Sequence, residues 1–383
     1  MKLLWIAPYP YFVSNKPQHP APWVQMLAYR LKEEAGIELT ILSMTASATS
    51  EIEEVEKDGI KFIFIKKINS IFTNEFTLFQ ISIRKLRSYL KKNYTKYDLI
   101  HLHGSEHQYH TSAKGLDIPK VLSIQGILTE YAKVVPNKLT VKYLTLKLGG
   151  IYETLDLKTV KNFSCRTHWD SGYVKKHCPD SKIFNIWEMI RPSFFTDHFS
   201  LKKDKLLFLG GTQQIKGFKE MLQAFDKIRA KANVKLMMAG NVNTEEVKNT
   251  IETYKLKNIS DDDIEIKGFL DEQGIIDVYN SAFCFVHPSY IDNSPNSVCE
   301  AQLSGLPVVA SDVGGVSSLI TDKETGILTD LNIDNIANSV LELLDDDSLR
   351  DKISEQSREL ARKRHDPDEI LKQNVEMYKS IIS

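Results

Sequence analysis

The stretch from residue 287 to residue 315 reads HPSYIDNSPNSVCEAQLSGLPVVASDVGG. It contains the end of an apolar run, a polar loop, a short helical pattern and a second apolar run, PVVAS, before a Gly-Gly pair. A strand, a helix and a strand in this order form a βαβ unit, because two parallel strands need a crossover helix. The stretch therefore predicts an α/β fold with a parallel sheet.

The same alternation extends along the chain in both directions. In the second half we expect strands at 206–209, 234–238, 264–266, 283–286 and 307–310, and helices at 218–230, 245–256, 272–281 and 297–304. In the first half we expect strands at 3–7, 37–42, 99–102 and 120–124. At the end of the chain we expect helices at 333–344, 349–364 and 370–382. Two such runs predict two doubly wound, Rossmann-like domains, 1–200 and 201–365. Since ligands bind at the carboxyl ends of parallel strands, we expect the site in a cleft across which the domains face each other.

The composition indicates a globular cytoplasmic protein. Of 383 residues, 42% are hydrophobic and 26% charged, which excludes a disordered or fibrous chain. No run approaches the roughly 18 apolar residues of a membrane span, and the opening apolar run is too short for a signal peptide. The four cysteines are scattered without a CxxC pair, so we expect reduced thiols.

The net charge of −1 hides a division between the two halves. Residues 1–200 hold 27 Lys and Arg against 19 Asp and Glu, a net +8, whereas residues 201–383 hold 22 against 31, a net −9. A basic first half fits an anionic partner. The excess is too modest and too widely spread for a general nucleic-acid binder.

The helix within the opening stretch is predicted to begin with a binding site for an anion or hydroxyl groups. Ser294 is a favourable N-cap, and Pro295 suits the first helical position. The backbone N–H groups of Asn296 and Ser297 would then point out of the helix start.

Two carboxylates flank this helix start. Asp292 precedes it and Glu300 lies in its second turn. A carboxylate in this place can accept two hydrogen bonds from a vicinal diol such as a ribose. The alternative is a capped helix with a solvated carboxylate at each end.

The seven-residue spacing between Asp292 and Glu300, followed by AQLSGLPVVAS, resembles the donor-site signature of the family-4 (group 1) retaining glycosyltransferases, whose usual form is Glu-x7-Glu. The resemblance implies the GT-B fold, with a final helix at 366–383 that crosses back to the first domain. It also implies retaining, hexosyltransferase-type transfer from a nucleotide-diphosphate sugar, without metal or cofactor. Glu300 would hold the ribose, and Asp292 would contact the donor sugar.

Two further motifs extend the resemblance. Residues 207–217, LFLGGTQQIKG, correspond to the family's Gly-Arg-x4-Lys-Gly, in which the Arg and the Lys clamp the donor diphosphate. Lys216 matches the lysine and Gly210 the glycine, but Gly211 stands in place of the arginine. In KGFL (267–270), Phe269 and Leu270 match a strand end that contacts the base.

The segments CRTHWD (165–170) and WEMIRPSF (187–194) are similar to a polysaccharide-biosynthesis subgroup of the family. They contribute four charged residues, Arg166, Asp170, Glu188 and Arg191. One interpretation is that an arginine binds donor phosphate and replaces the cation missing at Gly211. The other is an interdomain salt-bridge cluster.

The first half departs from the family pattern at two places. Residues 1–35 lack the usual Gly-Gly loop, and Gln125 stands where the family often has a histidine. We expect Gln125, His103 and Asp170 on the acceptor side. Four histidines fall within 101–110, but a metal is not expected there, because no cysteine or second carboxylate-histidine motif accompanies them.

Residues 76–97 form a basic, aromatic-containing amphipathic stretch. One interpretation is a surface helix whose apolar face packs on the core. The other is a peripheral contact with the inner face of the cell membrane, suited to an acceptor carried on a lipid. The acceptor expected from the resemblance is a growing polysaccharide or a lipid-linked oligosaccharide. Two alternatives are a nucleotide-sugar epimerase of the same architecture and a catalytically degenerate binding subunit.

Overall fold

The computed structural model describes residues 1–13, 22–67, 79–195 and 204–383. The chain divides into two compact units. The first comprises Met1–Met189 and His365–Ser383, and the second comprises Ile190–Arg364. The expected boundary at residue 200 lies outside the described residues.

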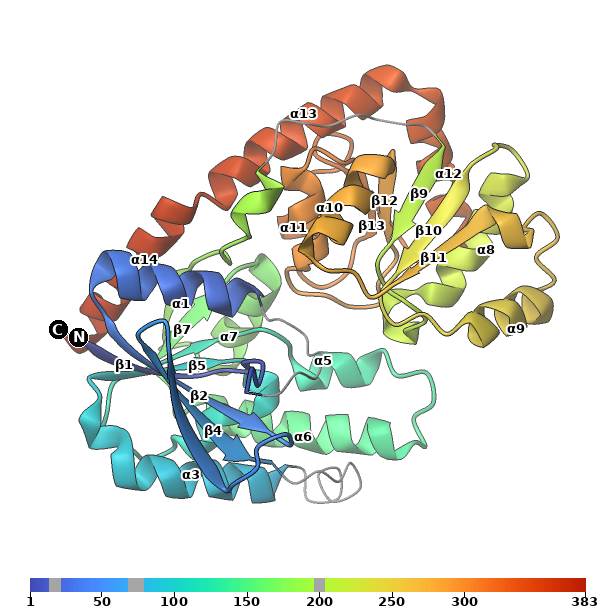
Figure 1. Ribbon diagram of the computed structural model, residues 1–383. Helices are drawn as coiled ribbons and strands as arrows, with labels where there is room; N and C mark the ends of the chain where they lie inside the picture. Colours follow the sequence, from blue (N-terminus) through green and yellow to red (C-terminus); the bar gives the residue numbers. More distant parts are fainter. Residues whose placement is uncertain (14–21, 68–78, 196–203) are drawn as a thin grey trace. The chain divides into compact units, whose positions relative to one another are not determined.

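The first unit contains an eight-stranded sheet in the order β3-β4-β2-β1-β5-β6-β7-β8 (Figure 1). All neighbouring strands are parallel except β3 and β4. The strands are β1 (Lys2–Ile6), β2 (Glu38–Thr45), β3 (Ile52–Lys57), β4 (Ile60–Lys66), β5 (Leu99–His103), β6 (Lys120–Ser123), β7 (Asn162–Cys165) and β8 (Lys182–Asn185). Its α-helices are α1 (Pro22–Ala35), α3 (Gln80–Asn93), α4 (Tyr109–Ser112), α5 (Leu128–Lys133), α6 (Val141–Leu157), α7 (His168–His177) and α14 (Pro367–Ile382).

Alternate residues of β1 belong to two different apolar cores. Leu3 and Trp5 pack with α1 and α14, whereas Leu4 and Ile6 pack with α3 and α4. Successive side chains of a strand point to opposite faces, so a strand buried on both sides is apolar throughout. The last helix of the chain, α14, therefore completes the core of the first unit.

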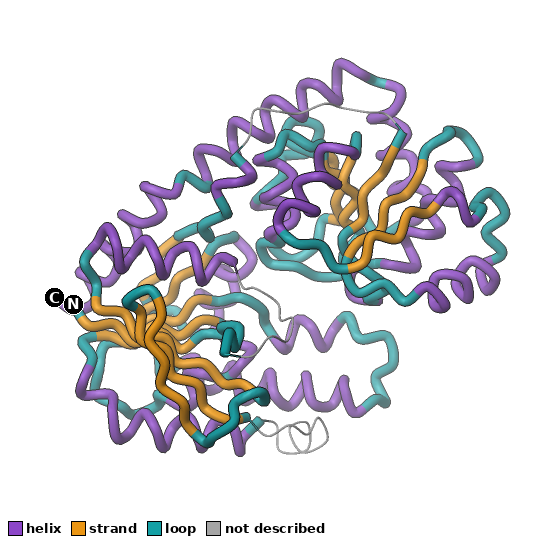
Figure 2. The backbone as a smooth tube through the Cα atoms, viewed as in Figure 1, coloured by secondary structure: helices purple, strands orange, loops and turns teal. Residues whose placement is uncertain are grey.

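The second unit contains a six-stranded parallel sheet in the order β11-β10-β9-β12-β13-β14, with helices on its faces (Figure 2). The strands are β9 (Lys205–Phe208), β10 (Lys235–Ala239), β11 (Ile264–Gly268), β12 (Cys284–His287), β13 (Val308–Ser311) and β14 (Ile327–Thr329). The α-helices are α8 (Phe218–Arg229), α9 (Thr244–Tyr254), α10 (Glu272–Ser281), α11 (Asn296–Leu303), α12 (Ile333–Asp345) and α13 (Asp347–Arg364). The carboxyl ends of β9 and β12 carry the loops of the donor motifs.

No helix in the described part of the chain is both long enough and apolar enough to cross a bilayer.

Candidate functional site

The loop after β9 is shaped by glycine. Gly211 has φ +57° and donates its N–H to the carbonyl of Ala239 at 3.0 Å. A Cβ at Gly211 would collide with the backbone carbonyl of Asn241. The position where the family pattern places an arginine is therefore, in this backbone, accessible only to glycine.

The short 3-10 turn Gln214–Lys216 is hydrogen-bonded to the loop after β12. The carbonyl of Ile215 accepts hydrogen bonds from the Tyr290 backbone N–H at 2.9 Å and the Ser289 hydroxyl at 3.1 Å. The next residue, Gly217, has φ +74° and lies so close to the carbonyl of Pro288 that no Cβ fits. These contacts fix the backbone from which the Lys216 side chain extends.

Lys216, Asp292 and His287 form one charged cluster. Lys216 Nζ lies 2.8 and 3.1 Å from the two carboxylate oxygens of Asp292, and His287 Nε2 lies 2.9 Å from Oδ2. Burial by itself would raise the pKa of Asp292, but Lys216 and His287 outweigh it and hold the pKa well below its usual range. Asp292 is therefore ionised at neutral pH. The Lys216 side chain is 31% exposed, so an arriving anion can reach its ammonium group.

His287 was not assigned a role from the sequence, although it opens the decisive stretch. The available signal was its place as the last residue of β12, at the carboxyl end of a parallel sheet.

Glu300 belongs to a second cluster in the same unit. Its Oε1 lies 2.9 Å from Arg191, and its Oε2 accepts a hydrogen bond from the Tyr279 hydroxyl at 3.4 Å. Burial raises the pKa of Glu300, and Arg191 opposes this shift. Arg191 also lies over the Phe194 ring, 4.7 Å from its centre, and pairs with Glu272 at 3.3 Å. Arg191 thus orients the carboxylate that the sequence assigns to the ribose.

The start of α11 differs from the expectation. The helix begins at Asn296, Pro295 occupies the N-cap, and no side chain caps it. Ser294 is buried with its hydroxyl 4.0 Å from Cys299 Sγ, so the predicted Ser294 cap is wrong. The N–H groups of Asn296 and Ser297 still lie in the first helical turn, where an α-helix offers them no internal acceptor.

Phe269 and Leu270 follow β11 directly. Phe269 is 81% exposed, which is unusual for a large aromatic ring, and Gly268 before it has φ +66°. An exposed ring at a strand end offers a face on which a planar base can stack.

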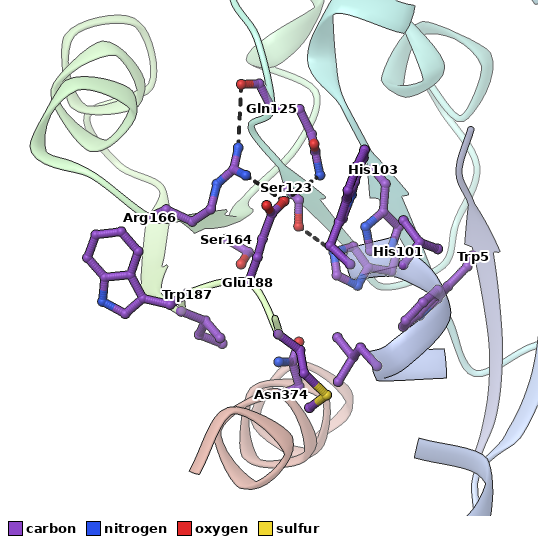
Figure 3. Close-up of a pocket in the computed structure, with 15 residues that line it drawn as sticks. Trp5, His101, His103, Ser123, Gln125, Ser164, Arg166, Trp187, Glu188 and Asn374 are labelled. Atoms are coloured by element: carbon purple, nitrogen blue, oxygen red, sulfur yellow. Dashed lines mark hydrogen bonds and ion pairs between the residues drawn. The ribbon is translucent and has the colours of Figure 1, made fainter. Parts of the chain in front are cut away.

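In the first unit, the buried ion pair of Arg166 and Glu188 lies at the carboxyl ends of β6 and β7. Arg166 lies 2.5 Å from Glu188, and Gln125 donates to Glu188 at 3.1 Å (Figure 3). Arg166 also donates to the carbonyl of Ile124 at 2.6 Å. Only 7% of the Arg166 side chain and 13% of the Glu188 side chain are exposed. The cavity beside the pair holds about 40 Å³, room for water but not for a nucleotide.

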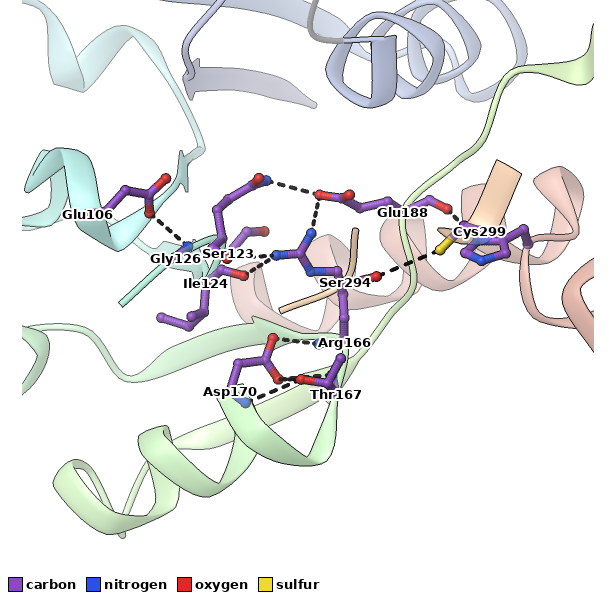
Figure 4. Close-up of polar contacts among 12 residues, drawn as sticks. Glu106, Ser123, Ile124, Gly126, Arg166, Thr167, Asp170, Glu188, Ser294 and Cys299 are labelled. Carbon is purple, nitrogen blue, oxygen red and sulfur yellow. Dashed lines mark hydrogen bonds and ion pairs between the residues drawn. The ribbon is translucent and has the colours of Figure 1, made fainter. Parts of the chain in front are cut away.

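Asp170 stabilises the start of α7 (Figure 4). It is fully buried and accepts hydrogen bonds from the backbone N–H groups of Arg166 and Thr167, both at 2.9 Å. Together with the Thr167 hydroxyl it forms the capping box of α7. Its carboxylate is therefore committed to the helix start, which conflicts with the expected acceptor-side role.

The histidines of 101–110 are mostly hydrogen-bonded within the core. His101 contacts the Tyr378 hydroxyl and the Ser123 hydroxyl, both at 2.7 Å, and His110 contacts the carbonyl of Glu153 at 3.1 Å. Burial lowers the pKa of His103 to about 3, so this ring is neutral where it lines the small cavity. Among the described residues, no group of three or more His, Cys, Asp or Glu side chains could hold a metal ion.

A larger cavity of about 360 Å³ lies at the carboxyl ends of β2 and β4 in the first unit. Its lining combines aromatic rings with the charged side chains of Lys67 and Glu106. The aromatic members are Tyr9, Trp23, Phe79 and Tyr109. A mostly apolar cavity with a few polar groups is typical of a small-molecule site.

The basic stretch 76–97 is described from residue 79 onward and contains α3. Its apolar side chains Ile83, Leu86, Tyr89 and Leu90 are buried, and the last three belong to a core cluster. The interpretation as a surface helix with a core-facing apolar side is confirmed. α3 consequently has no apolar face to offer a membrane.

Residues 191–360 match the family described as glycosyl transferases group 1. This segment therefore resembles a group 1 glycosyl transferase domain. This domain coincides with the unit that carries Lys216, Asp292 and Glu300, and the resemblance inferred from these motifs is confirmed.

Two curated relatives are glycosyltransferases. An uncharacterized glycosyltransferase of Methanocaldococcus jannaschii is 26% identical over 312 residues, 74% of this chain and 75% of its own length. The capsular polysaccharide biosynthesis glycosyltransferase CapM of Staphylococcus aureus is 28% identical over 179 residues, 46% of either chain.

Solved structures share the fold over nearly the whole chain. Sucrose-phosphate synthase of Thermosynechococcus elongatus has a TM-score of 0.80 at 15% identity and covers 99% of this chain and 98% of its own. Anabaena HepE, solved in complex with UDP, has a TM-score of 0.69 at 15% identity, with 99% and 100% coverage. The expected GT-B fold class, with two parallel-sheet α/β domains, is confirmed.

Proposed function

We propose that this protein transfers a hexosyl group from a nucleotide-diphosphate sugar to a hydroxyl of a glycan acceptor, with retention at the anomeric carbon and without a metal ion. The observation that carries the proposal is the Lys216–Asp292–His287 cluster at the carboxyl end of a parallel sheet, inside the family domain. The partly exposed ammonium group of Lys216 suits a diphosphate, because a lysine binds phosphate as a point charge.

In the proposed reaction, the bond between the anomeric carbon and the diphosphate oxygen breaks while the acceptor oxygen forms its bond on the same face of the sugar. The acceptor proton passes to the departing diphosphate. Negative charge develops on this leaving group, and Lys216 together with the first N–H groups of α11 stabilises it. Preorganised donors of this kind lower the barrier because they need no reorganisation during the step.

The two carboxylates have different tasks in this scheme. Asp292, ionised by its cationic neighbours, would contact the donor sugar and its developing positive charge. Glu300, held by Arg191, would accept the ribose hydroxyls. Phe269 would stack on the base.

The acceptor is assigned to the first unit. Its cavity of about 360 Å³ has the aromatic lining and the single lysine expected for a sugar attached to an anionic carrier. The CapM relative, which acts in capsular polysaccharide biosynthesis, supports a glycan acceptor, and the UDP bound to the HepE neighbour supports a nucleotide donor.

A thermal-shift screen against UDP, GDP, ADP and TDP tests donor binding. A ligand that binds only the folded state raises the apparent stability with the logarithm of its concentration. We expect one nucleotide to raise the melting temperature of the wild type and of Lys227→Ala, an exposed control on α8, and to raise that of Lys216→Ala much less. A panel without any shift contradicts the proposal.

The reaction type is tested with the nucleotide sugar of the base so identified. NMR of the product gives the anomeric configuration, and activity that persists in excess EDTA supports the metal-independent step. Conversion of the nucleotide sugar without an acceptor would instead identify an epimerase. Binding without turnover on any acceptor would indicate a degenerate binding subunit.

A further inference from the structure

The outer face of α6 carries a continuous stripe of exposed apolar side chains. Its members, all between 45 and 59% exposed, are Val141, Leu144, Leu148, Ile151, Tyr152 and Leu155. At about 100° of turn per residue they fall within an arc of about 100°, along about 21 Å of the helix axis. Leu139, just before the helix, is 93% exposed. An apolar surface of this extent marks an interaction site.

The opposite face of α6 holds the helix on the first unit. Glu153 is fully buried and accepts a hydrogen bond from the Leu128 N–H of α5 at 2.9 Å. Gly150 lets α6 approach α5 so closely that a Cβ would lie 2.6 Å from the Thr129 side chain. Figure 1 shows the two helices side by side. The exposed stripe is therefore the face that the unit's own core does not use.

The charges around the stripe are of one sign. Residues 131–158 include five exposed lysines, namely Lys133, Lys138, Lys142, Lys147 and Lys158. The two acidic residues of this segment, Glu153 and Asp156, are buried. The neighbouring Glu130 is engaged with Lys133 at 2.6 Å. The surface is thus apolar with a cationic border.

We propose that this face of α6 docks on the surface of an anionic lipid bilayer. The leucines and Ile151 would enter the boundary between headgroups and acyl chains, while the lysines contact lipid phosphates. The helix would lie in the membrane plane. A second copy of the chain fits the face less well, because a two-fold contact would bring the lysine borders together without acidic partners.

Docking through α6 also assigns the membrane contact to a different element from the basic helix α3. The inference is independent of the proposed transfer reaction, since lipid binding requires no substrate. If both hold, docking would bring the acceptor cavity of the first unit to a lipid-carried acceptor.

Vesicle flotation of the full chain tests the proposal. We compare vesicles of phosphatidylcholine alone with vesicles of equal parts phosphatidylcholine and phosphatidylglycerol, at low and high salt. We expect the wild type to float with the anionic vesicles, and less so at high salt because screening weakens the lysine contacts. The combined variant Leu144→Ser, Leu148→Ser, Ile151→Ser and Leu155→Ser should lose at least about tenfold in bound fraction, since it removes most of the inserted apolar surface.

Three comparisons make the result decisive. The control Tyr254→Ser with Leu360→Ser removes two exposed apolar side chains elsewhere and should float like the wild type. The combined variant must also stay folded, with a cooperative melting transition, because its four side chains are about half exposed and lie outside the core. The variant Arg84→Glu, Lys91→Glu and Lys92→Glu places the contact on α3 if it alone abolishes flotation, and this overturns the proposal.

Two other outcomes also overturn it. One is a wild type that does not float under any condition. The other is a wild-type dimer in light scattering that the combined variant dissociates, without lipid binding, which would assign the face to a second copy.

Discussion

Both units place charged residues after the carboxyl ends of two neighbouring parallel strands, and they use them differently. In the second unit, Lys216 and Asp292 follow the ends of β9 and β12, and the lysine remains 31% exposed. In the first unit, Arg166 and Glu188 follow the ends of β7 and β8, and the arginine is only 7% exposed beside a cavity of about 40 Å³. A charged residue at a strand end therefore indicates a binding site only when a ligand can still reach its charge.

The largest expected effect tests the buried pair. Arg166→Ala leaves Glu188 buried without its cation, and loss of one partner of a buried ion pair costs about 3–5 kcal/mol. We expect this loss of apparent stability in urea unfolding, with the nucleotide-induced thermal shift retained. Lys61→Ala, which breaks an exposed pair with Glu54, should cost less than about 1 kcal/mol. A stable Arg166→Ala protein that no longer binds nucleotide would restore the donor-phosphate interpretation of Arg166.

For the partly exposed Lys216 we expect a larger effect on activity than on stability. Lys216→Ala should lower kcat/KM by about 10²–10³-fold, the usual effect of removing one preorganised donor from a developing negative charge. Its melting temperature without ligand should fall less than that of Arg166→Ala, because Lys216 is partly solvated and His287 still pairs with the Asp292 carboxylate. Lys227→Ala serves as the control. Equal losses of stability in Lys216→Ala and Arg166→Ala would erase the distinction between the two sites.

The pH dependence of stability tests the burial of Glu153 in the first unit. Burial raises the pKa of Glu153 to about 8, whereas the unfolded chain ionises near 4.3. Between these values the folded state keeps a proton that the unfolded state has lost, so this group lowers stability as the pH rises from about 4.5 to 8.

Glu153→Gln removes that dependence. Relative to the wild type, the stability gained by Glu153→Gln should grow by about 3–4 kcal/mol between pH 5 and pH 8. Melting curves across this range provide the measurement, with Glu130→Gln as a partly exposed control. A wild type and a Glu153→Gln variant with parallel pH profiles would contradict the buried, protonated state.

The smallest effect concerns the loop geometry of the second unit. Gly211 and Gly268 both have positive φ, but only at Gly211 would a Cβ meet backbone atoms. Gly268→Ala should cost about 1–2 kcal/mol from the conformation alone, and Gly211→Ala about 1–2 kcal/mol more. Gly211→Arg, which recreates the family pattern, should accordingly lower activity. Higher activity in Gly211→Arg would show that the loop adapts.

The periodic elements were predictable because each is a local property of the sequence. The strands β1, β9 and β12 appeared as short apolar runs, and their structural bounds differ from the expected ones by a residue at either end. Helix starts depend on finer geometry. Ser294 has the chemistry of a cap, but its burial against Cys299 gives that place to Pro295.

The sequence by itself determined the α/β class, the parallel sheets and the pairing of Asp292 with Glu300 in one motif, because hydrophobic period and residue spacing are written along the chain. Tertiary structure alone decided which charges meet. It brought Lys216 to Asp292 and Arg191 to Glu300, and it left three leucines of α6 exposed while it buried the leucines of α3. The physical reason is that burial and ion pairing depend on contacts between residues far apart in sequence, which no local pattern specifies.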